Sequence, residues 1–213
     1  MKKRRLLLAD DHAIVVEGLR RVLDQPDLEI AAVVADGRAL VRAAEEIQPD
    51  IIIADITMPL LNGIDAVRQI RETNAGVKII FLTMHPDVAF ATEALAAGGS
   101  GYVLKSSAGD ELLTAIQEVE KGRRYVTKSI AEAVELGLSA RSNTWRSPLD
   151  KLTSRQREVL QLLAEGFPTK EIAAKLHVSP RTVEFHKYRI MDELGLRTTA
   201  ELSRYAARHG LVG

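Results

Sequence analysis

Five short apolar runs alternate with amphipathic stretches over the first 121 residues, and this alternation limits the fold more than any other feature of the sequence. The apolar runs are residues 6–9, 29–35, 51–54, 78–83 and 101–104. The helix-like stretches lie near residues 13–23, 37–47, 63–72, 86–97 and 109–121. Several runs are apolar at every position, as strands covered by helices on both faces must be. The pattern predicts a doubly wound α/β domain with a five-stranded parallel sheet, in the flavodoxin-like order 2-1-3-4-5.

The strand pattern stops after Gly122, and an all-helical region begins at Leu152. We interpret residues 124–148 as a linker that starts with a short helix and ends in a stretch rich in Ser, Asn and Pro. The expected organisation is a first domain over residues 1–123, this linker, and a second domain over residues 149–213.

Composition narrows the function classes. There is no cysteine, which excludes disulfides, thiolate catalysis and cysteine-based zinc sites. Residues 1–125 carry four more acidic than basic side chains, and residues 126–213 carry four more basic than acidic ones. This asymmetry favours metal or phosphoryl chemistry in the first region and nucleic acid in the second. No stretch approaches the roughly 18 uncharged apolar residues of a membrane span, so we expect a soluble, cytoplasmic protein.

Polar residues follow the ends of four of the predicted strands. Asp10 and Asp11 follow the first strand, and Asp55 follows the third. Thr83 ends the fourth strand, and Lys105 follows the fifth. Ligand sites in open α/β sheets form outside the carboxyl ends of the strands, so these side chains should meet at one edge.

Three neighbouring carboxylates repel one another unless a cation lies between them. With neither cysteine nor histidine at the strand ends, their hard oxygen ligands point to Mg²⁺. Such a site can hydrolyse a phosphate ester, or it can accept a phosphoryl group on a carboxylate. Acceptance requires an Asp nucleophile, a divalent ion and a positioned cation, and Asp55, Mg²⁺ and Lys105 supply these.

The residues at these strand ends resemble a known family. The pattern Asp10-Asp11, Asp55-x-x-Met58-Pro59, Thr83 and Gly101-Tyr102-x-x-Lys105 is similar to the receiver domain of two-component response regulators, over residues 4–121. The resemblance implies that Asp55 accepts a phosphoryl group from a sensor histidine kinase. It also implies that Lys105 pairs with the phosphoryl oxygens, that Thr83 follows with its hydroxyl, and that Tyr102 is an aromatic switch. The implied Mg²⁺ ligands are Asp10, Asp11, Asp55 and the backbone carbonyl of Thr57.

Two positions depart from the receiver pattern. Ser106 stands where proline often follows the lysine, which would change the stiffness of that loop. Met84 stands where a small residue is common, and it would shield an acyl phosphate from water.

The second region reads as a helix-turn-helix. We expect helices near residues 154–164, 169–176 and 180–194, with a three-residue turn at residues 177–179 between the last two. On the third helix, Val183, Ile190 and Leu194 share one side with Lys187, and the apolar members should be core. The opposite side carries Arg181, Glu184, Phe185, Tyr188 and Arg189. Two aromatic side chains on a solvent-exposed face are unfavourable, which indicates that this face binds a partner. The major groove of DNA is the favoured partner surface.

This segment resembles the LuxR-type helix-turn-helix. The matches include Thr153, Lys170-Glu171-Ile172-Ala173, Thr182-Val183 and Ile190, within about residues 150–205. The departures are Gln156 and residues 167–169, which lie outside the recognition helix. The expected DNA-binding residues are Lys170, Arg181, Thr182, Glu184, Phe185, His186, Lys187, Tyr188 and Arg189.

A receiver followed by a LuxR-type domain resembles the NarL/FixJ family of transcription factors. The resemblance implies a regulator and not an enzyme, with double-stranded DNA as its target and a homodimer forming on phosphorylation. It also suggests that the unphosphorylated receiver restrains the recognition helix. The alternative on the same acidic cluster is a Mg²⁺-dependent phosphatase, which would need a second Asp where Thr57 stands.

Overall fold

The computed structural model describes residues 3–141 and 148–212. Its first half is built on a parallel sheet of six strands in the order β2-β1-β3-β4-β5-β6. The strands are β1 (Arg4–Ala9), β2 (Leu28–Val34), β3 (Ile51–Ala54), β4 (Lys78–Thr83), β5 (Gly101–Leu104) and β6 (Tyr125–Val126). The first five strands confirm the predicted order, and β6 adds a sixth at the edge beside β5.

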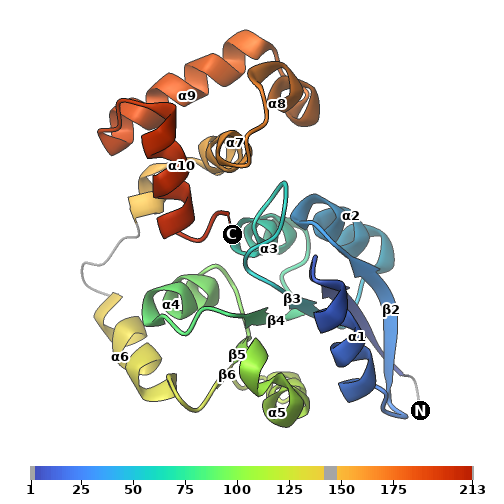
Figure 1. The fold of residues 1–213 in the computed structure, drawn as a ribbon. Coiled ribbons are helices and arrows are strands. Elements are labelled where there is room, and N and C mark those ends of the chain that lie inside the picture. The colour runs from blue at the N-terminus through green and yellow to red at the C-terminus, as the bar shows by residue number, and fades with distance from the viewer. Residues whose placement is uncertain (1–2, 142–147, 213) are drawn as a thin grey trace.

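Five helices cover the two faces of this sheet (Figure 1). They are α1 (Ala13–Val22), α2 (Gly37–Ile47), α3 (Gly63–Thr73), α4 (Val88–Ala96) and α5 (Ala108–Glu120), the last preceded by the 3₁₀ turn η1 (Lys105–Ser107). Helix α4 begins two residues later than expected. The Asp87 side chain accepts a hydrogen bond from the Ala89 N–H, which fixes the start of the helix.

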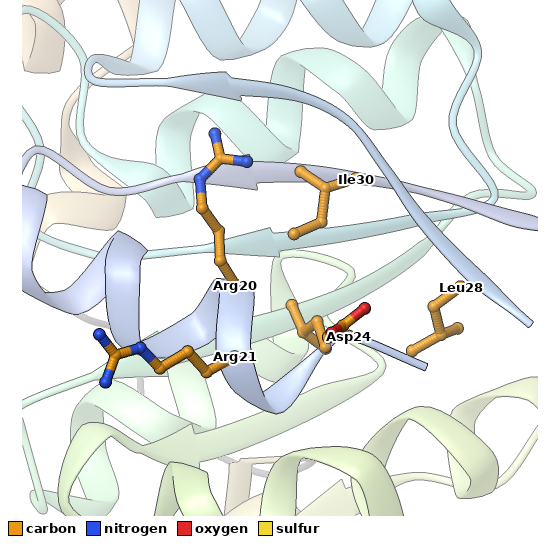
Figure 2. Close-up of a pocket in the computed structure, with 6 residues that line it drawn as sticks. Arg20, Arg21, Asp24, Leu28 and Ile30 are labelled. Atoms are coloured by element: carbon orange, nitrogen blue, oxygen red, sulfur yellow. The ribbon is translucent and has the colours of Figure 1, made fainter. Parts of the chain in front are cut away.

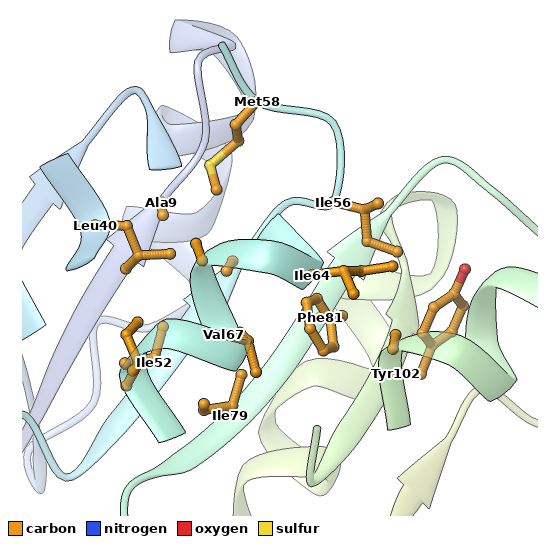
Figure 3. Packing of buried hydrophobic residues seen from close by; sticks show 14 of the residues in the cluster. Ala9, Leu40, Ile52, Ile56, Met58, Ile64, Val67, Ile79, Phe81 and Tyr102 are labelled. Atoms are coloured by element: carbon orange, nitrogen blue, oxygen red, sulfur yellow. The ribbon is translucent and has the colours of Figure 1, made fainter. Parts of the chain in front are cut away.

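Alternate side chains of each strand enter two separate cores, because successive residues of a strand point to opposite faces. Leu7, Ile52, Ile79, Phe81 and Tyr102 belong to the core that also contains residues of α2, α3 and α4 (Figure 3). The neighbouring positions along the strands belong to the core that contains residues of α1 and α5. Burial on both faces explains why the strands read as continuous apolar runs.

The predicted linker, residues 124–148, contains a strand that the sequence pattern does not reveal. Tyr125 and Val126 pair with Gly101 and Tyr102 of β5. The short helix expected in this range is present as α6 (Ala131–Arg141), and its Val134 is buried in the core beside α4. The end of the expected linker, 142–147, lies outside the described residues.

The second half contains four α-helices among the described residues. The 3₁₀ turn η2 (Pro148–Lys151) leads into α7 (Ser154–Ala164), α8 (Thr169–Leu176), α9 (Pro180–Leu194) and α10 (Thr199–Arg208). Capping boxes at Thr153 and Thr198 start α7 and α10, and Ser179 caps α9. A short turn joins α8 to α9, as the helix-turn-helix prediction requires. His177 in this turn has the left-handed conformation.

The two halves are docked through α7, whose polar side chains reach α2, α3 and the loop between β3 and α3. Arg157 Nε lies 2.6 Å from Asp65 Oδ1, and both side chains are buried. Glu158 pairs with Arg38 at 3.2 Å. Helices α8 and α9 lie on the far side of α7 from the sheet (Figure 1). No helix in the part of the chain that the structure describes is long and apolar enough to cross a bilayer.

Candidate functional site

Lys105, Asp10 and Asp55 meet at the carboxyl edge of the sheet. Lys105 Nζ lies 2.6 Å from Asp55 Oδ2 and 2.7 Å from Asp10 Oδ2. All three side chains are nearly buried. A single ammonium therefore faces two buried carboxylates, which leaves an excess of negative charge at the site.

The position of Asp55 follows from the close packing of the strand end. Its backbone N–H donates to the carbonyl of Ala9 on the neighbouring strand. Gly63, which begins α3, approaches so closely that a Cβ atom there would lie 2.0 Å from the carbonyl oxygen of Asp55. Only glycine permits this approach, so Gly63 fixes α3 against the segment that carries the carboxylate.

The electrostatics of Asp55 are set by opposing effects. Burial raises its pKa, while the hydrogen bond and charge of Lys105 oppose this rise, and the net pKa is above the usual value. The same two carboxylates raise the pKa of Lys105 in spite of its burial. An additional cation would stabilise the ionised form of Asp55.

The residues present fit a hard divalent cation. Carboxylate oxygens of Asp10, Asp11 and Asp55 and a ring nitrogen of His12 lie within 4.8 Å of one another. The buried Oδ2 atom of Asp10 has no well-oriented hydrogen bond from any described residue, although Lys105 is close enough for an ion pair. The group could therefore hold a metal ion.

Thr83 ends β4 and Tyr102 lies on the neighbouring strand β5, and both side chains are fully buried. The Thr83 hydroxyl accepts a hydrogen bond from the His85 N–H at 3.2 Å. The Tyr102 hydroxyl donates to the His85 carbonyl at 2.7 Å. The His85 ring bridges to the Thr57 hydroxyl at 3.1 Å and stacks on Phe90 of α4. Thr83, the Tyr102 ring and α4 are therefore linked through one residue, His85.

The predicted DNA-binding side of α9 faces outward. Phe185 is 58% exposed and Tyr188 is 65% exposed, and Arg181 and Arg189 are also exposed. Val183 and Ile190 are fully buried in the core of the second half, and Lys187 beside them is half-buried. Thr182 and His186 are half-buried, and Lys170 on α8 is exposed.

Glu184 is held by its own domain. The Thr169 hydroxyl, at the start of α8, donates to Glu184 Oε1 at 2.7 Å. The guanidinium of Arg189 lies over the Phe185 ring at 5.9 Å. Among the described residues, no side chain of α9 forms a hydrogen bond or ion pair with the first half of the chain.

A surface hollow of about 290 Å³ lies between the end of α1 and the start of β2. Arg20, Arg21 and Asp24 project around it (Figure 2). The hollow contains no residue of the predicted sites.

Sequence reasoning gives no role to several residues that the structure places beside the acidic cluster or on the loop that follows it. His12 follows the acidic pair, and its Nδ1 lies 2.9 Å from Asp11 Oδ1. His85 lies two residues after Thr83. From the sequence it is interpreted as a loop residue, and only the structure shows its contacts. Gln161, on α7, and Glu165, which caps the end of this helix, hydrogen-bond to the loop that follows Asp55. Only proximity to the strand ends could have pointed to the two histidines.

Two family models match the chain. Residues 6–117 match the response regulator receiver domain, and residues 150–206 match the bacterial regulatory proteins of the luxR family. The chain therefore belongs to the response regulators that carry a LuxR-type domain. It is a DNA-binding two-component response regulator, and nothing in the matches supports the phosphatase alternative.

Individual relatives agree with this assignment. The oxygen regulatory protein NreC of Staphylococcus aureus is 38% identical over 98% of this chain and 99% of its own length. A structure of the RcsB response regulator of Salmonella typhimurium is 30% identical with a TM-score of 0.66, covering 98% of each chain. A two-component response regulator of the LuxR family from Aurantimonas sp. SI85-9A1 is 39% identical with a TM-score of 0.60, and it covers 67% of this chain and 100% of its own.

Proposed function

We propose that Asp55 is the phosphoacceptor of this regulator and that its donor is the phosphohistidine of a sensor histidine kinase. The observation that carries the proposal is the pairing of Lys105 Nζ with Asp55 Oδ2 at 2.6 Å inside the acidic cluster. An Asp55 oxygen attacks phosphorus, an O–P bond forms, the N–P bond of the donor breaks, and the histidine leaves. Lys105 is placed to pair with the phosphoryl oxygens during this transfer.

The metal ion of the proposed site is Mg²⁺, held by Asp10, Asp11, Asp55 and the Thr57 carbonyl. Bound Mg²⁺ would offset the negative charge that the phosphoryl group brings. The gathering of carboxylate oxygens within 4.8 Å and the poorly satisfied Oδ2 of Asp10 support this assignment.

The proposed output surface is α9 with the start of α8. Arg181, Arg189 and Lys170 are exposed and suited to backbone phosphates. Glu184, Phe185 and Tyr188 are suited to base edges, and Thr182, His186 and Lys187 complete the surface. Dimers of the related RcsB have been solved bound to DNA, and this chain has 29% identity to that structure. We propose that phosphorylation likewise yields a DNA-bound homodimer of this chain, acting in the cytoplasm.

The switch runs from Asp55 through Thr83 and Tyr102. Phosphorylation adds about two negative charges beside Lys105. Movement of the Thr83 hydroxyl toward the phosphoryl group would withdraw the acceptor of the His85 N–H. Because Tyr102 donates to the His85 carbonyl, the Tyr102 ring and α4 are the elements that respond.

Labelling with acetyl phosphate tests the proposal. The wild-type chain should take up phosphate only with Mg²⁺ present, and Asp55→Asn should take up none while its circular dichroism is unchanged, because the two side chains are nearly isosteric. Binding-site selection followed by sequencing, with and without acetyl phosphate, should show stronger enrichment of one DNA motif for the phosphorylated wild type. Labelling that persists in Asp55→Asn would place the nucleophile elsewhere.

A further inference from the structure

Gln161 of α7 and Glu165, the residue that caps the end of this helix, bind the loop that connects β3 to α3. Gln161 Oε1 accepts a hydrogen bond from the Asn62 N–H at 2.7 Å, and Gln161 Nε2 donates to the Met58 carbonyl at 2.8 Å. Glu165 accepts from the Leu60 N–H at 3.0 Å. Three backbone groups of a receiver loop are therefore satisfied by the DNA-binding half.

Gln161 is fully buried, unlike most glutamines. Its Nε2 also donates to Glu165 Oε1, one turn further along α7, at 2.8 Å. A buried amide is costly unless its polar atoms are paired, and here both are. Removing the side chain would leave the Met58 carbonyl and the Asn62 N–H without these partners.

The loop bound by Gln161 carries the proposed phosphoacceptor. It begins with Asp55 directly after β3, and Thr57, whose carbonyl is a proposed Mg²⁺ ligand, immediately precedes Met58. The peptide group that Gln161 fixes is therefore adjacent to the peptide group that would bind the metal.

The loop also adopts a costly backbone conformation. Leu60 has a φ of +67°, and the Leu61 N–H donates to the Pro59 carbonyl across it at 2.8 Å, which forms a tight γ-turn. A γ-turn with positive φ is rare and strained for a residue with a Cβ. Such a conformation persists where the surroundings hold it, and here the Leu60 side chain packs on the core of the DNA-binding half.

We propose that Gln161 is a positioning residue of the phosphorylation site, supplied by the DNA-binding half, which holds the Thr57 carbonyl in a Mg²⁺-binding position. The inference rests on the proposed function of Asp55. Partners that orient metal ligands commonly contribute about 10- to 100-fold to metal affinity. A ligand already in place also loses less conformational freedom on binding. By linkage, Mg²⁺ should in turn strengthen the docking of α7.

The test measures Mg²⁺ affinity of the full-length chain by calorimetry, without phosphodonor. Gln161→Ala should raise the Kd for Mg²⁺ by about 10-fold, the lower end of the range for such partners. Acetyl phosphate labelling of this variant should be slow at limiting Mg²⁺ and recover at saturating Mg²⁺, since Asp55 and Lys105 are intact. If Gln161→Ala does not fold, as judged by circular dichroism, Gln161→Met replaces it with similar volume and no polar atoms.

Gln69→Ala is the matched control. Gln69 Nε2 donates to Glu158 Oε1 at 2.7 Å across the same interface, without touching the loop. Its Mg²⁺ affinity should equal that of the wild type. Equal affinities for wild type and the Gln161 variant would overturn the inference, and so would equal losses in the Gln161 and Gln69 variants. Wild-type labelling is read separately, so absence of phosphate on Asp55 would identify failure of the proposed function instead.

Discussion

The acidic cluster and the recognition helix bring their polar side chains together in opposite ways. Asp10, Asp55 and Lys105 come from segments far apart in the chain, and they meet in a buried group with short ion-pair distances. The side chains on α9 are neighbours in one helix, and Phe185 and Tyr188 are more than half exposed. The charges of the acidic cluster therefore affect the stability of the fold, whereas those of α9 are free to contact a partner.

This difference predicts different responses to the same substitution. A charge that neutralises buried carboxylates contributes to stability, because its loss leaves those carboxylates uncompensated. An exposed charge on a helix contributes little to stability, and its effect should be seen in binding.

The largest expected effect is on stability. Lys105→Met should lower the free energy of unfolding by about 3–5 kcal/mol at neutral pH, because two buried carboxylates lose the ammonium that both of them face. Arg189→Met, the matched substitution on the exposed surface, should change it by less than about 0.5 kcal/mol. Urea denaturation of both variants measures the difference, and similar values for the two would remove the distinction between the regions.

The pH dependence of the Lys105→Met variant has a definite sign. The pKa of Asp55 is already raised by burial, and loss of Lys105 raises it further. The folded state then binds a proton more tightly than the unfolded state, so stability falls as pH rises above the ordinary Asp pKa of 3.8. The deficit relative to wild type should shrink toward that pH, and added Mg²⁺ should reduce it at neutral pH.

Sequence patterns were sufficient for the convergence of the acidic cluster. Parallel strands end at one edge, so Asp10, Asp55 and Lys105 had to be neighbours once the alternation of strands and helices was recognised. Strand β6 could not be found in the same way. Tyr125 and Val126 are only two residues, too few for a periodic pattern, and their pairing depends on where the chain returns after α5.

The role of α7 was also beyond the sequence. Its apolar positions predict a core-facing helix, and no sequence pattern points to a contact made by Gln161. Gln161 is buried because a second surface, the loop after β3, packs on the face that the helical pattern leaves polar. A single sequence contains no periodic signal for contacts between two separately folded cores.

The second-largest expected effect is on DNA binding. It distinguishes side chains that contact phosphates from side chains that contact bases. Arg189→Ala should weaken binding to all sequences and reduce the slope of log affinity against log salt by about one unit, as loss of one phosphate contact requires. Tyr188→Ala should change base preference by about 1–3 kcal/mol at the affected position. Binding to a library of sites at several salt concentrations measures both. If the two variants behave alike, the proposed orientation of α9 in the groove is wrong.

The smallest expected effect concerns Glu184. Of the three side chains proposed to read bases, it is the one that forms a hydrogen bond within its own domain in the described structure. The Thr169 hydroxyl donates to Glu184 Oε1 at 2.7 Å, which orients the carboxylate before DNA arrives. Thr169→Val keeps the shape and removes this bond, so Glu184 should lose about 1 kcal/mol of discrimination at the base that it contacts. Affinity for sites altered at other positions should be unchanged.

A double-mutant cycle provides the control for this last effect. In a Glu184→Ala background, Thr169→Val should have no further influence on base preference, because the carboxylate that it orients is gone. A Thr169→Val effect that persists without Glu184 would mean that Thr169 contacts DNA itself. In that case Thr169 itself belongs to the recognition surface, which is then larger than α9 and Lys170 alone.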